Sequence, residues 1–262
     1  MSGSLLQDKC AVITGAGSGV GRVSALRFAE EGARVACADI NLDEAKETVR
    51  QVEATGGSAI AVCVDVSREA QVVQMLDAAA EQFGRVDIVF NNAGIPTPRL
   101  GARLEDHTAE DFQRLVAVNL GGVFFGCKHA VLRFKQQGGS GVILNTGSVA
   151  GLVAWGGTVY GATKGAVHQL TRAVAIENAQ FGIRVNAICP AAMPATGFMA
   201  AGGLDPAALQ LAATQEKLGA QHPLGRPITP QDCAEAALYL VSDRASNITG
   251  VVVPIDGGYV AR

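Results

Sequence analysis

The sequence contains few aromatic and few charged residues, which make up 5% and 17% of its 262 residues. Soluble domains average roughly 25% charged residues. The deficit, together with 48% hydrophobic residues, predicts a large apolar core and excludes intrinsic disorder. Lys and Arg form no basic run, and the formal net charge is −3. Because nucleic-acid binding requires a basic surface, we expect no nucleic-acid partner.

Targeting and membrane-spanning segments are not apparent either. The first residues lack the basic region and apolar stretch of a signal peptide. No run of ~18 uninterrupted apolar residues occurs, and the last residues carry no lipidation signal. We therefore expect a cytoplasmic protein that has no membrane association.

Metal-binding patterns are missing as well. The six cysteines are scattered without a C-x-x-C pair, and the four histidines show no ligand spacing with each other or with cysteine. Structural and catalytic zinc sites need such clusters. We expect no metal site, and we interpret the cysteines as small buried thiols of a reducing compartment.

Glycine, in contrast, is abundant: 32 of 262 residues, against ~7% in average proteins. The glycines follow no collagen period. Strand-like runs at 10–14, 34–38, 59–64, 86–91, 141–146 and 183–188 alternate with helical patterns ending at 31 and spanning 43–56, 68–83, 109–136 and 158–179. Such alternation with apolar strands predicts a single α/β domain with a doubly wound parallel sheet. Ligands of these sheets bind at the carboxyl ends of the strands.

Residues 190–228 interrupt this alternation. They contain five prolines, a Gly-Gly pair and a helical pattern at 206–220. An excursion above the carboxyl edge is typical of a substrate lid. A purely structural excursion is the alternative.

A glycine-rich turn follows the first strand, with the spacing G-x-x-x-G-x-G after Thr14. Gly15 permits a tight turn, and Gly19 leaves room for a pyrophosphate at a helix N-terminus, where the helix dipole favours an anion. Gly21 allows the helix to approach the strand closely. The placement between strand and helix predicts a dinucleotide site.

The second strand ends in Asp39, 18 residues beyond Gly21. A carboxylate there can accept hydrogen bonds from both hydroxyls of an adenosine ribose and repels a 2′-phosphate. No basic residue follows Asp39, and Ser18 rather than Lys or Arg precedes Gly19. This pattern favours NAD over NADP. The alternative for Asp39 is a solvated turn residue or helix cap.

Tyr160 and Lys164 are four residues apart within a helical pattern, so they lie on one helix face. A neighbouring cation favours the phenolate, which would suit tyrosine to acid–base catalysis. The alternative is a solvated surface pair. Ser148 follows the apolar run 142–145, and its hydroxyl can hydrogen-bond a reacting carbonyl. Because G-x-S-x-G is absent, an esterase is disfavoured.

Further motifs complete a pattern. They are Asp65 after the third strand, Asn91-Asn92-Ala93-Gly94, Asn119, and Ile255-Asp256-Gly257-Gly258 near the end. With the glycine turn, Ser148 and Tyr160-x-x-x-Lys164, they make the sequence resemble the short-chain dehydrogenase/reductase family over nearly the whole chain. The similarity is to its common subgroup of about 250 residues, which implies a Rossmann fold of about seven strands.

The resemblance implies a role for each residue. Tyr160 would be the acid/base and Ser148 would orient the substrate oxygen. Lys164 would bind the nicotinamide ribose and lower the tyrosine pKa, and Asn119 would hold a water of the proton relay. The expected cofactor-binding residues are Gly15, Ser18, Gly19, Val20, Gly21, Asp39, Ile40, Asp65, Val66, Asn92, Ala93, Gly94, Tyr160, Lys164, Pro190, Met193 and Thr196. For Asn119 the alternative is a mid-helix residue bonded to its local backbone. For Asn91-Asn92-Ala93-Gly94 the alternative is an ordinary turn after a strand.

One motif departs from the family. Pro190-Ala191 stands where Pro-Gly is usual, so the threonine that would contact the carboxamide falls one residue late if it is Thr196.

The expected activity is NAD-dependent interconversion of a hydrophobic secondary alcohol and its ketone. The expected pocket residues are Ser148, Val153, Ala154, Trp155, Tyr160, Met193, Phe198, Met199 and Leu204. Lid packing or subunit contacts are alternatives for several of them. A 3-oxoacyl-thioester reductase and a non-catalytic NAD(H) sensor are alternative functions. The resemblance also implies a homotetramer, with contacts expected from 115–130, 158–179 and 251–255.

Overall fold

The structure is a computed structural model, and it describes residues 4–98, 101–193, 198 and 212–262. Seven parallel strands form one sheet in the order β3-β2-β1-β4-β5-β6-β7. The strands are β1 (Cys10–Thr14), β2 (Arg34–Asp39), β3 (Ser58–Cys63), β4 (Ile88–Asn91), β5 (Gly141–Thr146), β6 (Ile183–Pro190) and β7 (Val252–Ile255). The predicted doubly wound parallel sheet is thereby confirmed.

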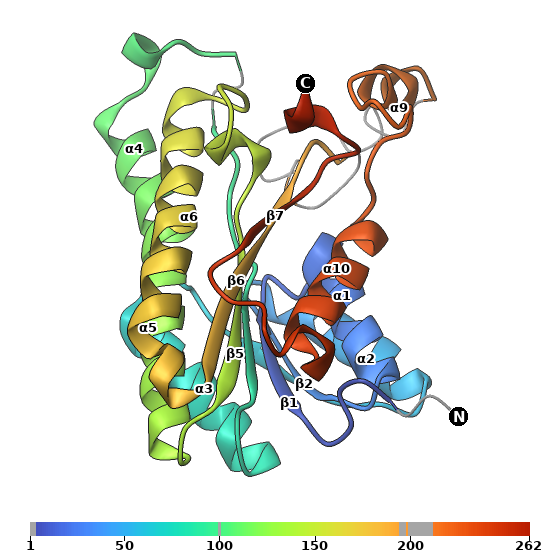
Figure 1. Ribbon diagram of the computed structural model, residues 1–262, viewed down its shortest axis with the longest axis vertical. Coiled ribbons are helices and arrows are strands. Elements are labelled where there is room, and N and C mark those ends of the chain that lie inside the picture. The colour runs from blue at the N-terminus through green and yellow to red at the C-terminus, as the bar shows by residue number, and fades with distance from the viewer. Residues whose placement is uncertain (1–3, 99–100, 194–197, 199–211) are drawn as a thin grey trace.

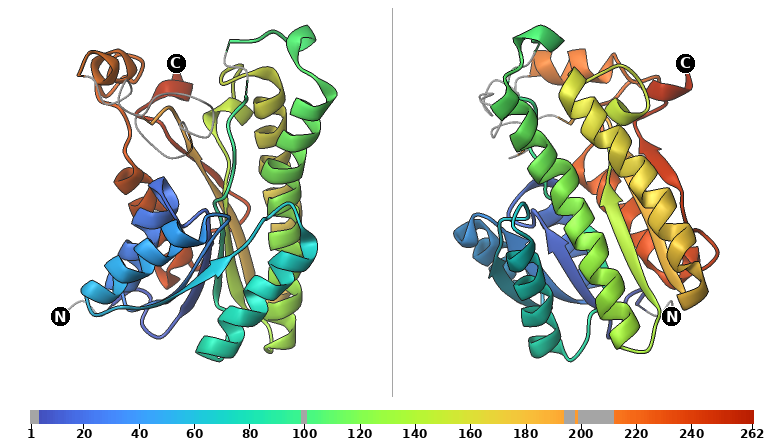
Figure 2. Two further views of the ribbon diagram at one scale, coloured as in Figure 1. Left: turned by 180° about the vertical axis from the view of Figure 1, so that it is seen from behind. Right: turned by 90° about the vertical axis from the view of Figure 1, so that its left-hand side faces the viewer.

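Helices cover both faces of the sheet (Figure 1). One layer contains α1 (Gly19–Glu30), α2 (Leu42–Ala54) and α10 (Pro230–Val241), and the other contains α3 (Glu69–Phe83), α4 (Ala109–Leu115), α5 (Gly122–Gln136) and α6 (Thr158–Asn178). The short helix α9 (Ala212–Gly219) lies at the same end of the molecule as the C-terminus. In Figure 2, right, α5 and α6 run side by side across one face.

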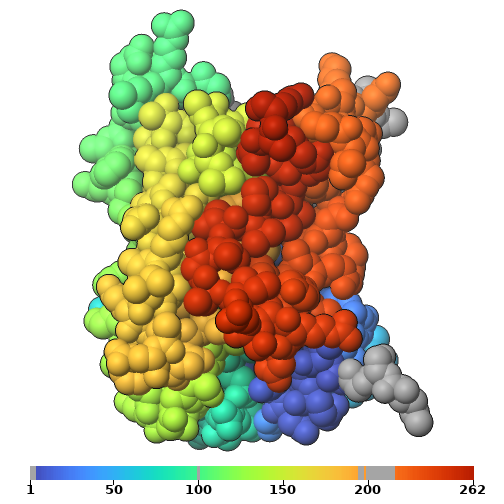
Figure 3. All heavy atoms as spheres, in the orientation of Figure 1, coloured from blue at the N-terminus to red at the C-terminus, as the bar shows by residue number. Residues whose placement is uncertain are grey.

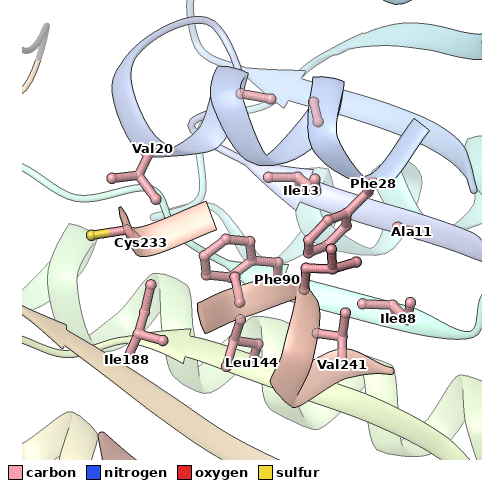
Figure 4. Close-up of a cluster of buried hydrophobic side chains, with 14 of the residues drawn as sticks. Ala11, Ile13, Val20, Phe28, Ile88, Phe90, Leu144, Ile188, Cys233 and Val241 are labelled. Atoms are coloured by element: carbon pink, nitrogen blue, oxygen red, sulfur yellow. The ribbon is translucent and has the colours of Figure 1, made fainter. Parts of the chain in front are cut away.

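The central strands are mainly apolar because each side of the sheet is covered. In β1, Ala11 and Ile13 belong to the core cluster under α1 and α10, while Val12 belongs to the cluster under α3 and α5. Figure 4 shows the first cluster, in which the rings of Phe28 and Phe90 stack with centroids 6.5 Å apart. The low charge content of the chain follows from this two-sided burial.

Several elements differ from the sequence expectations. The helix expected over 109–136 contains a π-helical turn, η2 (Val116–Gly121), and a 3₁₀ turn, η1 (Leu104–Asp106), lies in the region expected to be a loop. Strand β6 continues two residues further, to Pro190. Helix α10 was not among the expected elements. The expected helix at 206–220 is described only from residue 212 onward.

Within the described part of the chain, one helical stretch, Ala109–Gln136, is long and apolar enough to cross a bilayer by length and composition. Core helices of α/β domains meet the same criterion. Its Val123, Ala130 and Phe134 are buried in the core cluster against α3 and the sheet, whereas the exposed fractions of Phe112 and Phe124 are 53% and 46%. The stretch therefore packs as a core helix that leaves apolar side chains on its outer face.

Candidate active site

The glycine-rich turn joins β1 to α1 at the carboxyl edge of the sheet. Gly15 and Gly19 adopt φ angles of +66° and +51°, in the left-handed region that other residues rarely occupy. A Cβ on Gly21 would lie 2.1 Å from the Gly15 carbonyl oxygen. The first turn of α1 is therefore packed directly on the backbone of the turn, which is the close approach expected from the spacing.

The N-terminus of α1 lacks a capping side chain, as do those of α3 and α6. Its N-cap, Ser18, makes no side-chain cap hydrogen bond, and its first turn contains no acidic residue. In contrast, the helices that begin after Asn41, Thr108 and Thr229 each have a side-chain cap and acidic residues in the first turn. The N–H groups of α1 thus have no capping side chain in the described part of the chain, and they can donate hydrogen bonds to an anionic group.

Asp39 at the end of β2 faces the same turn. One carboxylate oxygen accepts a hydrogen bond from the Gly17 amide (2.8 Å), and the other accepts one from the Asn41 amide (2.9 Å). A Cβ on Gly17 would lie 2.8 Å from Asp39 Oδ2, so a larger residue there would displace the carboxylate. Beside it, Ile40 is 70% exposed.

Arg22, a cation that was not predicted as a site residue, also reaches this turn. Its guanidinium pairs with Glu44 (2.6 Å), donates to the Thr48 hydroxyl (3.0 Å) and contacts the Gly17 carbonyl. Glu44 therefore balances the charge of Arg22 beside the turn.

Asp65 and Val66 follow β3. The Asp65 carboxylate accepts hydrogen bonds from the amide (3.0 Å) and hydroxyl (2.6 Å) of Ser67. Val66 is buried, and a Cβ on Gly122 would lie 2.7 Å from its Cγ2. Val66 therefore packs against the start of α5, so the segment after β3 contacts the helix that covers the middle of the sheet.

The segment after β4 is held by two threonines, neither of which was predicted as a site residue. Thr14 Oγ1 accepts hydrogen bonds from the amides of Asn92 and Ala93, both at 3.0 Å. Asn92 donates to the Thr14 carbonyl (3.0 Å) and accepts from the Thr146 hydroxyl (3.1 Å). The ends of β1, β4 and β5 are thereby tied together.

Asn119 lies fully buried in the π turn η2. Its side chain accepts from the Ile95 amide (2.8 Å) and donates to the Ile95 carbonyl (2.9 Å). The alternative of a bond to the local helix backbone is therefore wrong. A Cβ on Gly94 would lie 3.2 Å from Asn119 Oδ1 and 3.6 Å from Lys164 Nζ, so both polar groups face Gly94.

Tyr160 and Lys164 are both buried on α6, with exposed fractions of 9% and 2%. The alternative of a solvated surface pair is therefore wrong. Lys164 Nζ donates to the Thr146 carbonyl (2.8 Å) and lies 5.7 Å from the centroid of the Tyr160 ring. The Ser148 hydroxyl shares a hydrogen bond with the Tyr160 phenol and contacts the Pro190 carbonyl (3.4 Å). The structure thus brings Ser148, Tyr160 and Lys164 together at one edge.

The direction of the Tyr160 pKa differs from the expectation. Burial raises the pKa of Tyr160 to about 12, despite the hydrogen bond with Ser148. Burial likewise lowers the pKa of Lys164 to about 8. Desolvation disfavours the charged form of each group, and it is the largest cause of both pKa shifts. The expected lowering of the tyrosine pKa by Lys164 is therefore not the net effect here.

Apolar side chains surround the phenol. Ala150 and Val159 are buried beside it, with Ile95 and Trp155 packed against them, and the Phe198 ring lies 5.9 Å from that of Tyr160. The Trp155 ring also contacts Tyr259 of the C-terminal 3₁₀ turn η6 (Tyr259–Ala261), a neighbour that sequence analysis missed. Figure 3 shows the C-terminal segment at the same end of the molecule as α9.

The other described residues of the predicted pocket do not belong to the apolar cluster beside the Tyr160 phenol. Ala154 is exposed, as is Val153 at 37%. Met193 packs into the first core cluster, where its sulfur lies 3.9 Å from that of Cys233 on α10. Thr196, Met199 and Leu204 lie outside the described residues. Within the described residues, no group of three His, Cys, Asp or Glu side chains is arranged to hold a metal ion.

Known proteins share this architecture. A family model described as "Enoyl-(Acyl carrier protein) reductase" matches residues 15–260. The chain is 42% identical to 3beta-hydroxysteroid dehydrogenase 1 of Eggerthella lenta, over 97% of this chain and 94% of the relative. It is 39% identical to meso-2,3-butanediol dehydrogenase of Serratia marcescens, over 97% of this chain and 95% of that relative.

A solved structure is similar throughout. It is that of 3-ketoacyl-(acyl-carrier-protein) reductase from Brucella melitensis complexed with NADH, with a TM-score of 0.85, 39% identity, and coverage of 97% of this chain and 99% of that one. The dehydrogenases among the relatives act on alcohols, and the solved neighbour binds a nicotinamide cofactor. The chain therefore belongs to the short-chain dehydrogenase/reductase family and is an oxidoreductase that acts on alcohols with a nicotinamide cofactor.

Proposed function

We propose that this protein uses NAD to interconvert a hydrophobic secondary alcohol and its ketone, with Tyr160 as the acid/base. The observation that supports this most is the buried cluster of Ser148, Tyr160 and Lys164 at the edge where the glycine turn and Asp39 also lie. A phenol and a hydroxyl in an apolar surrounding suit a neutral carbonyl or carbinol.

The residues at the edge fit a dinucleotide. The α1 N-terminus has no side-chain cap, which leaves the amides of 18–20 for a pyrophosphate. Asp39, with two oxygens accepting only one amide each, retains acceptor capacity for ribose hydroxyls. Asp65 and Val66 would contact the adenine. The segment from Asn92 to Gly94 would line the centre of the cofactor cleft, and Lys164 would bind the nicotinamide ribose.

Asp39 supports NAD as the cofactor instead of NADP. Its carboxylate would face a 2′-phosphate as a like charge, and such juxtapositions cost several kcal/mol. The nearby cation, Arg22, is already paired with Glu44.

The chain's own residues would handle the proton. When bound, the oxidised nicotinamide supplies the hydride acceptor and a positive charge. Tyr160 would remove the proton of the substrate hydroxyl, while Ser148 hydrogen-bonds the same oxygen. Burial is the main cause that raises the pKa of Tyr160 to about 12, so proton removal depends on added positive charge next to the phenol. Lys164 and Asn119, which both face Gly94, would pass the proton on toward water.

The pocket supports an apolar substrate. Ile95, Trp155 and Phe198 pack against the buried residues next to Tyr160, and the hydroxysteroid dehydrogenase relative carries a name that specifies a cyclic alcohol. We propose a cyclic or aromatic secondary alcohol.

A substrate panel tests this proposal. With NAD⁺, cyclic, aryl-alkyl and steroid secondary alcohols are expected to give NADH formation with kcat/KM at least about tenfold above short charged hydroxy acids, because burying a charge in an apolar pocket is unfavourable. NADH absorbance is the readout. A preference for small charged hydroxy acids would overturn the substrate class.

A 3-oxoacyl-thioester reductase is the second candidate, and the similarity to the Brucella reductase favours it. The same panel, run in reverse with a 3-oxoacyl thioester, separates the two. A clear preference for that thioester with NADPH would replace the proposal. Tight NADH binding without turnover of any compound would instead indicate a sensor.

We also propose a single cytoplasmic domain whose segment 190–228 acts as a substrate lid, and a homotetramer. Exposed apolar side chains support the association: Phe124 on α5 is 46% exposed and Ile176 on α6 is 76% exposed. Large exposed apolar patches mark subunit contacts.

Phe124→Glu is expected to shift the protein from a tetramer to smaller species, because it buries a charge in the contact. Light scattering coupled to size-exclusion chromatography measures the change. Leu224→Glu, at an exposed apolar residue outside these helices, is the control and should stay tetrameric. A wild-type monomer would contradict the proposal.

A further inference from the structure

A buried imidazole lies beneath the loop that carries Ser148. His168 on α6 is 2% exposed, and its Nε2 lies 3.4 Å from the Ser148 amide nitrogen, which donates to it. The thiol of Cys189, fully buried on β6, lies 3.0 Å from the same ring nitrogen. Neither residue was predicted to belong to the site.

The tautomer of this ring follows from its partners. A backbone N–H can only donate, so Nε2 must carry the lone pair. The ring also forms a hydrogen bond with the backbone of Gly151, where the protonated Nδ1 can donate to the carbonyl. One neutral imidazole therefore bonds both ends of the 3₁₀ turn η3 (Val149–Gly151). These ends are the N-cap, Ser148, and the last residue, Gly151.

The charge state of His168 fits this role. Burial first, and then the charges of Arg172 and Lys164, lower the pKa of His168 to about 4. Burial raises the pKa of the facing Cys189 thiol to about 12. Both groups are therefore neutral near neutral pH, and the Nε2 lone pair remains available.

The loop sits directly on the ring. A Cβ on Gly147 would lie 2.4 Å from His168 Nε2 and 2.7 Å from Cys189 Sγ, and a Cβ on Gly151 would lie 2.6 Å from His168 Cε1. Both glycines flank the segment that presents the Ser148 hydroxyl. A change in the ring therefore moves the backbone on both sides of that hydroxyl.

We propose that His168 is a positioning residue for Ser148: as a neutral Nδ1-protonated imidazole it holds the Ser148–Gly151 loop at both ends and so fixes the serine hydroxyl beside the Tyr160 phenol. The inference rests on the proposed alcohol–ketone chemistry and deepens it. Loss of the ring would leave the Ser148 amide and the Gly151 carbonyl buried without their partner, and the loop would relax to satisfy them.

Two variants of the full-length protein test the role. His168→Leu removes both hydrogen bonds, and kcat is expected to fall about tenfold to 10²-fold, the loss caused by small misplacements of a reacting group. His168→Gln keeps an amide oxygen near the position of Nε2, and it should recover kcat to within about fivefold of wild type. The dissociation constant of NADH should change less than about twofold in both, because the dinucleotide residues are untouched.

The controls separate positioning from packing. Val167→Ala removes buried volume from the adjacent residue of the same helix, and it should lower the melting temperature without lowering kcat. In a Ser148→Ala background, His168→Leu should have no further effect on kcat, since the hydroxyl that it positions is gone. Equal losses in the Leu and Gln variants, or full activity of His168→Leu in an active enzyme, would overturn the inference and leave the proposed function standing.

Isotope-edited NMR provides a readout that needs no turnover. The ring-nitrogen shifts of wild-type His168 should show a neutral ring with the proton on Nδ1, and His168→Gln should move the Ser148 amide resonance. If the wild type oxidises no alcohol, the proposed function fails, and this measurement alone decides the inference. A proton on Nε2 would reject it, whether or not His168→Leu folds.

Discussion

Replacing Tyr160 by Phe is expected to lower kcat for alcohol oxidation by about 10²–10⁴-fold, the usual contribution of a positioned acid/base. The ring is buried among Ala150, Val159 and Phe198, and phenylalanine fills the same space. Only the hydroxyl that hydrogen-bonds Ser148 is lost. Steady-state kinetics and NADH fluorescence titration measure the two effects, and NADH affinity should stay within about twofold.

Tyr239→Phe is the matched control, because Tyr239 on α10 is 46% exposed and distant in sequence from the site helix α6. It should leave kcat unchanged. If Tyr160→Phe retained more than about a tenth of wild-type kcat, another group would have to transfer the proton.

The second large effect concerns cofactor choice. Wild type is expected to favour NAD over NADP by about 10²-fold or more in kcat/KM, and Asp39→Asn should remove most of that preference by improving the use of NADP. The physical reason is that the change removes a like charge facing the 2′-phosphate, and about 2.7 kcal/mol corresponds to 10²-fold. Kinetics with each cofactor at fixed alcohol concentration provide the comparison.

Asp43→Asn removes a carboxylate in the first turn of α2, four residues from Asp39, and serves as the control for a general change of charge. Its cofactor preference should equal that of wild type. A wild-type preference for NADP would reject the role of Asp39 and favour the thioester reductase.

The parts of the molecule that were predictable are those where spacing alone dictates geometry. Apolar runs at strand length, separated by helical patterns, predicted the parallel sheet because both of its faces are covered. The G-x-x-x-G-x-G spacing predicted the packing of Gly21 on Gly15, since only glycine permits it. The i, i+4 spacing predicted that Tyr160 and Lys164 share one face of α6.

Other features depend on contacts between residues distant in sequence. The π turn exists where Asn119 reaches Ile95, 24 residues away, and no local pattern predicts that pairing. Met193 lies in the core because Cys233 of an unexpected helix packs against it. The raised pKa of Tyr160 likewise reflects burial by segments from several parts of the chain. The pKa of a motif residue therefore depends on its burial in the folded chain, which the local sequence does not reveal.

The start of α1 has a consequence for the stability of the whole protein. A helix end that lacks a side-chain cap and acidic residues gives up stabilisation that α2, α4 and α10 obtain from their own residues. With the dinucleotide bound, an external anion would supply it, and the free energy of binding would be added to that of folding, by about 2.7 kcal/mol at a hundredfold excess over the dissociation constant. The stability of the folded chain would then increase with the concentration of the nicotinamide nucleotide, which the reaction oxidises or reduces without depleting the total pool.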